Sequence, residues 1–432
     1  MSRLVKIINP RDFEKEERAG IPAEVSIRAQ AIMDDVAKRG MDALSEYSEK
    51  FDNFKLDSGN VLVSASEIDS AESRLDETQK RAIDEAFERV SKVQREIAKD
   101  ALRECACKVG EGSVALVPRA ISRVGIYVPG GVAPLPSSLL MAGIPARAAG
   151  VKEIIVCTPP RKEGVSPAIL YAAKKLGIDK IYRIGGTQAI AAMAYGIPGI
   201  MGKVDMACGP GNVYAAAAKQ IAASSGLLKV DLVAGPSEVL IIAGEGARAD
   251  YAAADMLAQA EHGVNSPAIL LTKSGEFAEG VEAELEKQLA ELPNSENAEK
   301  SLRNYGAIVV VESIAQAQEI ADSYAPEHLE ILGKDAQEIA KGVTNAGAVF
   351  VNTCESFADY GMSGGNHILP TGGTARFLSG LSVYEFIVRT YIEVMEGSEQ
   401  EELAELAGAF GDLEGLNAHA NAARLRKKGA KK

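Results

Sequence analysis

The sequence predicts an α/β protein built from two doubly wound, Rossmann-like modules, with helices before them and a helical element after them. From about residue 109 to residue 380, short apolar runs that fit buried strands alternate with amphipathic stretches that fit helices. This alternation is typical of mostly parallel sheets covered by helices. A chain of 432 residues, 47% of them hydrophobic, can bury a large core and divide it between domains.

The N-terminal part is expected to form an arm over residues 1–22 and a helical part over 23–108 that packs with the second α/β module. Pro22 is expected to open a helix that Gly40 interrupts, because proline suits a first helical turn and glycine weakens a helix interior. Further helices are expected over 64–70 and 77–102.

The two α/β modules are expected over residues 109–240 and 241–380. In the first module the expected strands begin at residue 122 and then cover 153–157, 180–184 and 229–233, and its helices cover 137–149, 168–176, 187–195 and 213–224. Around the second module the expected strands are 239–242, 268–272, 307–311, 329–332 and 348–351, with helices at 250–261, 277–289 and 314–324. From residue 383 the chain is expected to be helical to its end, so that residues 381–432 form a C-terminal helical element.

Charge and cysteine content limit the class of protein. A formal net charge of −13 disfavours nucleic acid or an anionic membrane as the main partner. No apolar run approaches the length of a membrane span, and the N-terminus lacks the apolar core of a signal peptide. The five cysteines lack the spacings of structural zinc sites, so we expect reduced thiols in a cytoplasmic protein.

Four glycine-containing turns stand at strand ends or helix starts, at residues 129–131, 185–188, 209–212 and 235–237. Ligands of open parallel sheets bind at the carboxyl ends of strands, where helix N-termini favour anionic groups. None of the turns is a G-x-G-x-x-G with a downstream acidic ribose partner, so a nucleotide would bind in a non-standard way. Taken singly, each loop is more often only a tight turn.

The segment from Tyr324 to Glu330 carries a carboxylate and an imidazole side by side, in Glu327 and His328. Pro326 cannot continue the preceding helix and is expected to hold Ala325 in an extended conformation. Neighbours in a regular strand point to opposite faces, so both side chains can serve one site only if the backbone there is irregular. Together they offer two groups for proton transfer, although a solvated surface junction would have the same local sequence.

A candidate metal site begins with Gln259 and His262, which are three positions apart on an expected helix and so share a face. Asp359 and His419, far downstream, can complete the set, and zinc suits such nitrogen and oxygen ligands. A lone helix histidine is more often packed or solvated than a ligand, and no H-E-x-x-H motif is present.

Seven motifs, taken together and in order, resemble the histidinol dehydrogenase family. They span about residue 120 to 425 and include all four histidines of the chain. The resemblance implies a homodimeric, zinc-dependent enzyme that oxidises L-histidinol to L-histidine with two NAD+. The motifs are VGIYVPGG at 124–131, GPGN at 209–212, AGPSE at 234–238, AQAEH at 258–262, PEHLE at 326–330, NHILPTGGTAR at 366–376 and EGLNAHAN at 414–421.

The resemblance also implies roles for single residues. His328 would be the general base and Glu327 would activate water for the second oxidation. The implied zinc ligands are Gln259, His262, Asp359 and His419. The implied substrate contacts are Ser237, His328, His367 and Glu414, together with the zinc ligands, and the implied NAD contacts are Tyr127, Gln188 and Asn212. In the family the C-terminal element reaches across the dimer, so Glu414 and His419 would complete the partner's site.

Two differences from the family keep other functions open. Asp359 precedes His367 by eight positions, one more than the family spacing, and Glu355 is an outside candidate for the ligand. The segment after His262 also lacks the acidic stretch expected in biosynthetic members. A paralogue that oxidises another amino alcohol or polar diol is therefore an alternative. A zinc hydrolase would leave the three NAD positions unexplained, and a non-catalytic binding protein would not need the Glu327–His328 pair.

Overall fold

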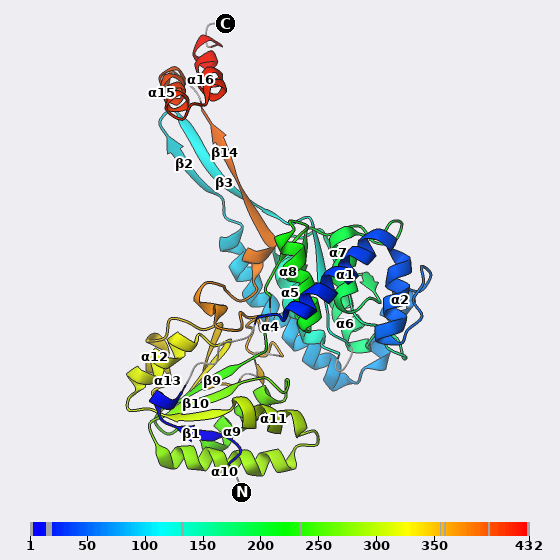
Figure 1. Ribbon diagram of the computed structural model, residues 1–432, viewed down its shortest axis with the longest axis vertical. Coiled ribbons are helices and arrows are strands. Elements are labelled where there is room, and N and C mark those ends of the chain that lie inside the picture. The colour runs from blue at the N-terminus through cyan, green and yellow to red at the C-terminus, as the bar shows by residue number, and fades with distance from the viewer. Residues whose placement is uncertain are drawn as a thin grey trace.

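The computed structural model describes residues 3–13, 20–130, 134–233, 235–354, 356–357, 360–395 and 398–429. Figure 1 shows two α/β bodies and a narrow arm that projects away from both. The predicted α/β class with parallel sheets is therefore confirmed. Within the described ranges, no helix combines the length and the apolar character that crossing a membrane requires.

The first body contains a five-stranded parallel sheet in the order β6-β5-β4-β7-β8. Successive residues of β5 face two different cores: Ile154 and Val156 face one, and Ile155 and Cys157 face the other. Because both faces of the sheet are buried in this doubly wound arrangement, each strand is almost wholly apolar. The strands are β4 (Arg123–Tyr127), β5 (Glu153–Cys157), β6 (Lys180–Tyr182), β7 (Met206–Cys208) and β8 (Lys229–Val230), and the helices are α5 (Pro136–Ala148), α6 (Pro167–Lys175), α7 (Gly186–Tyr195) and α8 (Val213–Ser224).

The N-terminal helices pack on this first body and not on the second, so the expected packing of residues 23–108 is wrong. Helix α1 (Ala23–Arg39) lies against α7 and α8, and α4 (Glu77–Ala101) lies against α5. The apolar stripes of both helices complete the cores on the two faces of the sheet, which the periodicity of a helix alone does not reveal. Helices α2 (Met41–Asp52) and α3 (Ala65–Ser70) lie between them in the chain.

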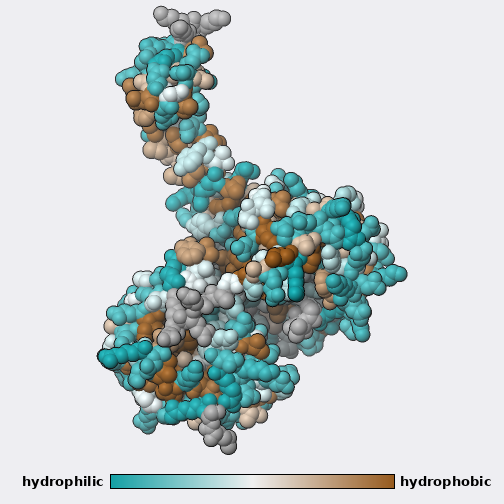
Figure 2. All heavy atoms as spheres, in the orientation of Figure 1, coloured by the Kyte–Doolittle hydropathy of each residue, from teal (hydrophilic) through white to brown (hydrophobic). Residues whose placement is uncertain are grey.

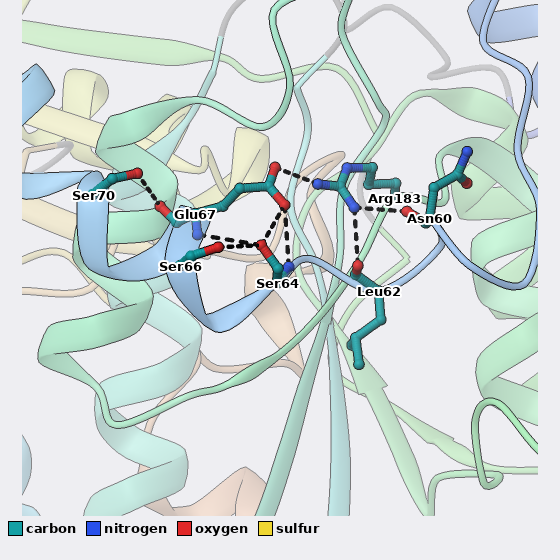
Figure 3. Close-up of polar contacts among 7 residues, drawn as sticks. All are labelled: Asn60, Leu62, Ser64, Ser66, Glu67, Ser70 and Arg183. Carbon is teal, nitrogen blue, oxygen red and sulfur yellow. Dashed lines mark hydrogen bonds and ion pairs between the residues drawn. The ribbon is translucent and has the colours of Figure 1, made fainter.

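A strap formed by residues 60–67 ties these helices to the edge strand β6, as Figure 3 shows. Val63 donates a backbone hydrogen bond of 2.8 Å to Ile181. The buried guanidinium of Arg183 donates to the carbonyl oxygens of Asn60 and Leu62, at 2.6 and 3.0 Å, and pairs with Glu67. One buried cation therefore holds the strap at three points.

The second body contains a six-stranded parallel sheet in the order β1-β11-β10-β9-β12-β13. Its first strand comes from the N-terminal arm: Lys6 pairs with Ala307, which adds β1 to the edge of the sheet. Two cores again cover the two faces. The strands are β1 (Lys6–Ile8), β9 (Val239–Ala243), β10 (Ala268–Thr272), β11 (Ala307–Val310), β12 (His328–Leu332) and β13 (Ala348–Val351), and the helices are α9 (Ala249–Ala260), α10 (Gly275–Glu291), α11 (Glu296–Tyr305), α12 (Ile314–Tyr324) and α13 (Ala336–Lys341).

The C-terminal element is not wholly helical, which corrects the expectation for residues 381–432. Strand β14 (Ile387–Val394) pairs with β3 (Gly112–Ala120), which pairs in turn with β2 (Cys105–Val109), all antiparallel. The β-branched and aromatic residues of β14 suit a strand, but its partners lie more than 250 positions earlier. These strands form the arm in Figure 1, and helices α15 (Glu399–Leu413) and α16 (Asn417–Gly429) form its tip.

A short connector joins the two sheets. The connector leaves the carboxyl end of β8 and enters the amino end of β9 within eight residues, 231–238. The carboxyl edge of the first sheet and the amino edge of the second are therefore held near one another. A second crossing reinforces this: Asn366 donates to the carbonyl of Met141 in α5 at 2.7 Å, and Gly372 donates to the side chain of Glu238.

Candidate active site

The turn before β12 brings Glu327 and His328 to the amino edge of the second sheet. Helix α12 ends at Tyr324, and Ala325 adopts a left-handed conformation with φ 51° and ψ 63°. The expectation of an extended Ala325 is wrong, because this residue closes the helix by donating its N–H to Ala321 at 2.7 Å. Pro326 then directs the chain into the strand, so that Glu327 precedes the first residue of β12.

Glu327 is a buried carboxyl group held by the AGPSE segment. Its Oε2 accepts hydrogen bonds from the hydroxyl of Ser237 at 2.5 Å and from the N–H of Glu238 at 3.2 Å. Burial raises the pKa of Glu327 to about 8. A positive charge on His328 lowers this pKa in part, and the carboxylate of Glu238 raises it. The group can therefore take up and release a proton near neutral pH.

Glu238 has a structural part in this site that the sequence did not indicate. Its side chain is 1% exposed, and its Oε1 accepts from the N–H of Glu327 at 3.1 Å and from the N–H of Gly372 at 3.1 Å. It thus fixes the backbone of the candidate catalytic residue and anchors the segment that contains His367. The motif AGPSE includes Glu238, but an acidic residue next to a strand carries no signal of which peptide groups it will bind.

His328 faces α9, and this direction follows from the strand. Leu329 and Ile331 of β12 belong to the core beneath α12, so His328 points to the opposite face, where α9 lies. Its Nδ1 lies 3.3 Å from Oε1 of Gln259, and its ring packs on Phe350 at a centroid distance of 5.6 Å. The structure therefore brings Glu327, His328, Ser237 and Gln259 together.

The predicted metal ligands are only partly assembled. Gln259 is fully buried in α9, and its Nε2 has no hydrogen-bond partner among the described residues. His262 follows just after α9, with its backbone N–H donating to the carbonyl of Gln259 at 3.2 Å. The amide oxygen of Gln259 and an imidazole nitrogen of His262 are ligand types that zinc accepts, whereas the unpartnered Nε2 is a hydrogen-bond donor and not a ligand.

Of the remaining predicted ligands, the structure describes only His419, which lies away from this pair. Asp359 and the outside candidate Glu355 lie outside the described residues. His419 lies in α16, at the tip of the arm, and Figure 1 shows that tip far from the second body. Among the described residues, no three histidine, cysteine, aspartate or glutamate side chains gather closely enough to hold a metal.

Of the two other predicted substrate contacts, one lies in the body of the chain and one in the arm. His367 is half-buried in the crossing segment, between Asn366, which binds α5, and Gly372, which binds Glu238. Glu414 is exposed and directly follows α15 in the arm. The body of one chain thus supplies His367, whereas Glu414 and His419 lie together at the arm's tip.

The predicted dinucleotide contacts gather at the carboxyl edge of the first sheet. Strands β4 and β7 are neighbours where the chain order reverses, the place at which open sheets bind nucleotides. Tyr127 ends β4, and its hydroxyl accepts from the N–H of Gly186 at 3.1 Å. Gly186 begins α7, and Gln188 lies in the first turn of this helix. Asn212 caps α8 by accepting a hydrogen bond from the N–H of Tyr214. Two helix N-termini and three side chains therefore surround one edge.

The remaining glycine turn differs from these. The turns at 129–131, 185–188 and 209–212 follow strands of the first sheet, but Gly235–Ser237 leads into β9 and belongs to the Glu327 site. Gly131 and Ala234 lie outside the described residues. Sequence position alone did not separate the turn that serves the acid–base site from those at the dinucleotide edge.

Comparison with known proteins confirms the resemblance that the motifs indicate. The family model for histidinol dehydrogenase matches residues 16–427. The histidinol dehydrogenase of Heliobacterium mobile is 40% identical over 408 residues, 94% of each chain, and that of Methanopyrus kandleri is 42% identical over 409 residues, 94% of each chain. The crystal structure of histidinol dehydrogenase from Elizabethkingia anophelis has a TM-score of 0.91 with this chain at 35% identity, over 100% of both chains.

Proposed function

The chain belongs to the histidinol dehydrogenase family, and we propose that it oxidises L-histidinol to L-histidine, by way of the aldehyde, with two NAD+ and one zinc ion per subunit. The observation that supports this most is the hydrogen-bonded site around Glu327, at the amino edge of one sheet that the connector holds near the glycine-rich carboxyl edge of the other. A proton-transfer pair and a dinucleotide edge are the two parts that an alcohol oxidation needs.

The first oxidation removes a proton and a hydride from the carbinol. His328 takes the hydroxyl proton as the C–H hydride leaves for NAD+, which yields the aldehyde, NADH and a proton. Gln259, 3.3 Å from the imidazole Nδ1, fixes the orientation of the ring so that the other nitrogen can serve the substrate.

The second oxidation requires water. Glu327, whose pKa burial raises to about 8, removes a proton from a water molecule that adds to the aldehyde. The resulting hydrate loses a second hydride to a second NAD+, with His328 again accepting the proton, and the carboxylate product forms. Ser237 and Glu238 hold Glu327 in place throughout, because they bind its carboxylate and its backbone.

The cofactors have candidate positions. Gln259, His262, Asp359 and His419 would hold zinc, which supplies positive charge to bind the amine and imidazole nitrogens of the substrate. Tyr127, Gln188 and Asn212 would contact NAD+. His367 and Glu414 would contact the substrate.

We also propose a homodimer in which the arm of each chain completes the site of the other. Glu414 and His419 lie at the tip of the arm, and the arm exposes many apolar side chains, which Figure 2 shows as brown patches. An exposed apolar surface of this kind is typical of an interface. The side chains are Val109, Tyr391, Ile392, Val394, Met395, Leu403, Leu406, Phe410, Leu413, Leu416 and Leu425. All five cysteines are free thiols, which supports a cytoplasmic location.

One assay tests the reaction. Purified protein with NAD+ and L-histidinol is expected to form two NADH per histidinol consumed, to lose activity on chelation and to regain it with zinc. If zinc-containing protein binds NAD+ yet does not turn over histidinol, the substrate is another amino alcohol or diol. The longer spacing between Asp359 and His367 is the feature that favours this alternative. Hydrolysis of an ester or amide without NAD+ would instead support a zinc hydrolase.

A mixing experiment tests the shared site. His328→Ala, which removes the base of both oxidations, and His419→Ala are each expected to be inactive alone. After joint denaturation and refolding, half of the dimers would be mixed and each would contain one intact site, so about a quarter of the parental activity should return. No recovery, with mixed dimers present, would contradict the exchange of arms.

A further inference from the structure

A buried ion pair lies next to the dinucleotide edge of the first sheet. Lys219 comes from the middle of α8 and Asp231 directly follows β8, and their side chains are only 5% and 1% exposed. The Nζ of Lys219 is paired with Oδ1 of Asp231. A buried pair of this kind is often no better for stability than two apolar side chains, so stability alone does not account for it.

Both charges bind the peptide groups of Gly209. Lys219 donates to the Gly209 carbonyl at 3.1 Å, and the Gly209 N–H donates to Oδ2 of Asp231 at 2.8 Å. Gly209 has φ +106°, and a Cβ at this position would come within 2.2 Å of the carbonyl oxygen of Tyr127. The N–H and the carbonyl of Gly209 are therefore each bound by a charged side chain, and the Tyr127 backbone leaves no room for a side chain at position 209.

The position of Gly209 sets the positions of the proposed NAD contacts. Gly211 lies against the ring of Tyr127, where a Cβ would be 3.2 Å from Cε1. Asn212, an exposed residue, ends the loop, and its side-chain oxygen accepts hydrogen bonds from the N–H groups of Tyr214 and Ala215. A shift of Gly209 would therefore move the surface that Tyr127 and Asn212 present.

Asp231 also begins the connector that leads to the acid–base site. Ser237, six positions later, donates to Glu327 at 2.5 Å. Six residues span at most about 20 Å, so the Gly209 loop and the Glu327 site lie at the two ends of a short connector. The same carboxylate is thus joined to the dinucleotide loop by a hydrogen bond and to the Glu327 site by the backbone.

We infer that Lys219 and Asp231 are positioning residues that hold the GPGN loop in the geometry that binds the dinucleotide. The inference rests on the proposed function in so far as the dinucleotide is NAD+. Neither residue touches the reacting atoms. Their loss acts on cofactor binding and leaves the binding of the alcohol largely intact.

The test uses the double variant Lys219→Met/Asp231→Asn, which removes both charges and so leaves no unpaired ion in the core. Glu153→Gln is the matched control, because it weakens the ion pairs of Glu153 with Arg123 and Lys180, at the opposite edge of the same sheet. The measurements on the intact protein are hydrogen exchange of the amides of Gly209 and Gly211, the NADH dissociation constant by fluorescence, and KM for NAD+ and for L-histidinol.

We expect the loop amides to exchange about tenfold faster in the double variant, and the NADH dissociation constant and KM for NAD+ to rise about tenfold, while KM for histidinol changes less than about twofold. Glu153→Gln should leave all four values as in the parent. Unchanged exchange and unchanged NADH affinity in a folded double variant would overturn the inference, and so would an equal rise in both KM values.

A conservative variant covers the case in which the double variant does not fold. Lys219→Arg keeps the charge and a donor, so it should fold and show a smaller rise in loop exchange and in the NADH dissociation constant. Parental values for Lys219→Arg beside an unfolded double variant would assign the pair to stability alone and overturn the inference. Failure of the proposed function looks different, because the parent would then bind no NADH while the exchange of the loop still responds to the pair.

Discussion

The hydroxyl of Ser237 lies 2.5 Å from Oε2 of Glu327 and so joins the amino ends of two adjacent parallel strands, β9 and β12. Open parallel sheets usually bind ligands at the carboxyl ends of their strands. The first sheet follows this rule with its glycine loops. The second sheet presents its acid–base groups at the opposite edge, because the connector places that edge toward the first sheet.

The raised pKa of Glu327 predicts the pH dependence of the second oxidation. With a pKa of about 8, Glu327 is mostly protonated at pH 7 and becomes the required carboxylate as the pH rises. The rate of aldehyde oxidation should therefore increase with pH through about 8. Ser237→Ala removes a hydrogen bond that favours the charged form, so it should move this limb to higher pH. A limb that persists in Glu327→Gln would belong to another group.

The same group predicts a cost in stability at alkaline pH. The folded protein binds one proton more than the unfolded chain between the ordinary glutamate pKa of 4.5 and the folded value of about 8. The contribution of Glu327 to the free energy of unfolding is therefore complete below pH 4.5. It declines by about 1.4 kcal/mol per pH unit as the pH rises from 4.5 to about 8.

Glu327→Gln does not titrate, so it should melt several degrees above the parent at pH 9 and close to it at pH 5. Calorimetry of both proteins at the two pH values checks this expectation. Equal differences in melting temperature at both pH values would show that the carboxyl group is not strained by burial.

Two glycines with positive φ separate conformational strain from steric clash. Gly226→Ala, at φ +66° with nothing within 4 Å of the added Cβ, should cost about 1 kcal/mol from strain alone. Gly209→Ala adds a contact of 2.2 Å with the Tyr127 carbonyl, so it should cost more than about 3 kcal/mol and abolish NADH binding. Urea denaturation and NADH titration measure both effects. Similar losses in the two variants would contradict the packing of Tyr127 on this loop.

The strap at the edge of the first sheet predicts that substituting Arg183 costs much more stability than substituting Glu67, its partner in the ion pair. Arg183→Met leaves the carbonyls of Asn60 and Leu62 without their buried donor and should cost about 3 kcal/mol. Glu67→Gln removes only the half-exposed partner and should cost less than about 1 kcal/mol. Limited proteolysis should cut residues 53–64 readily only in Arg183→Met, and equal cleavage of both variants would refute this role.

Local sequence predicted the elements whose signals are local. Pro326 after an amphipathic helix indicated the junction at Glu327, and apolar runs such as 153–157 marked buried strands at their observed bounds. What failed depends on distant partners. Strand β14 is defined by pairing with β3, and the exposed faces of both strands lack the alternation that marks a strand packed on a core. Ala325 was expected to follow the proline rule, but closing α12 required the left-handed conformation.

The candidate site also contains residues that motifs identify and residues that only the structure reveals. Glu327, His328, Ser237 and Gln259 were found from motif residues, and the structure brings them together. Glu238, Lys219 and Asp231 act on backbone groups, and residue type alone does not say which peptide a buried charge will meet. The packing of the N-terminal helices on the first sheet could not be predicted either, because the apolar stripe of a helix does not indicate which surface it packs against.

The pairing of Lys6 with Ala307 has a consequence for how the protein is made. A ribosome releases the N-terminal strand first, yet its neighbour β11 emerges only about 300 residues later. By then the helices and strands of the first body have been made, while β1 still lacks its partner strand. Vectorial synthesis thus makes the beginning of the chain one of the last pieces to be placed, and a fusion or a pause near the N-terminus acts on completion of the second body.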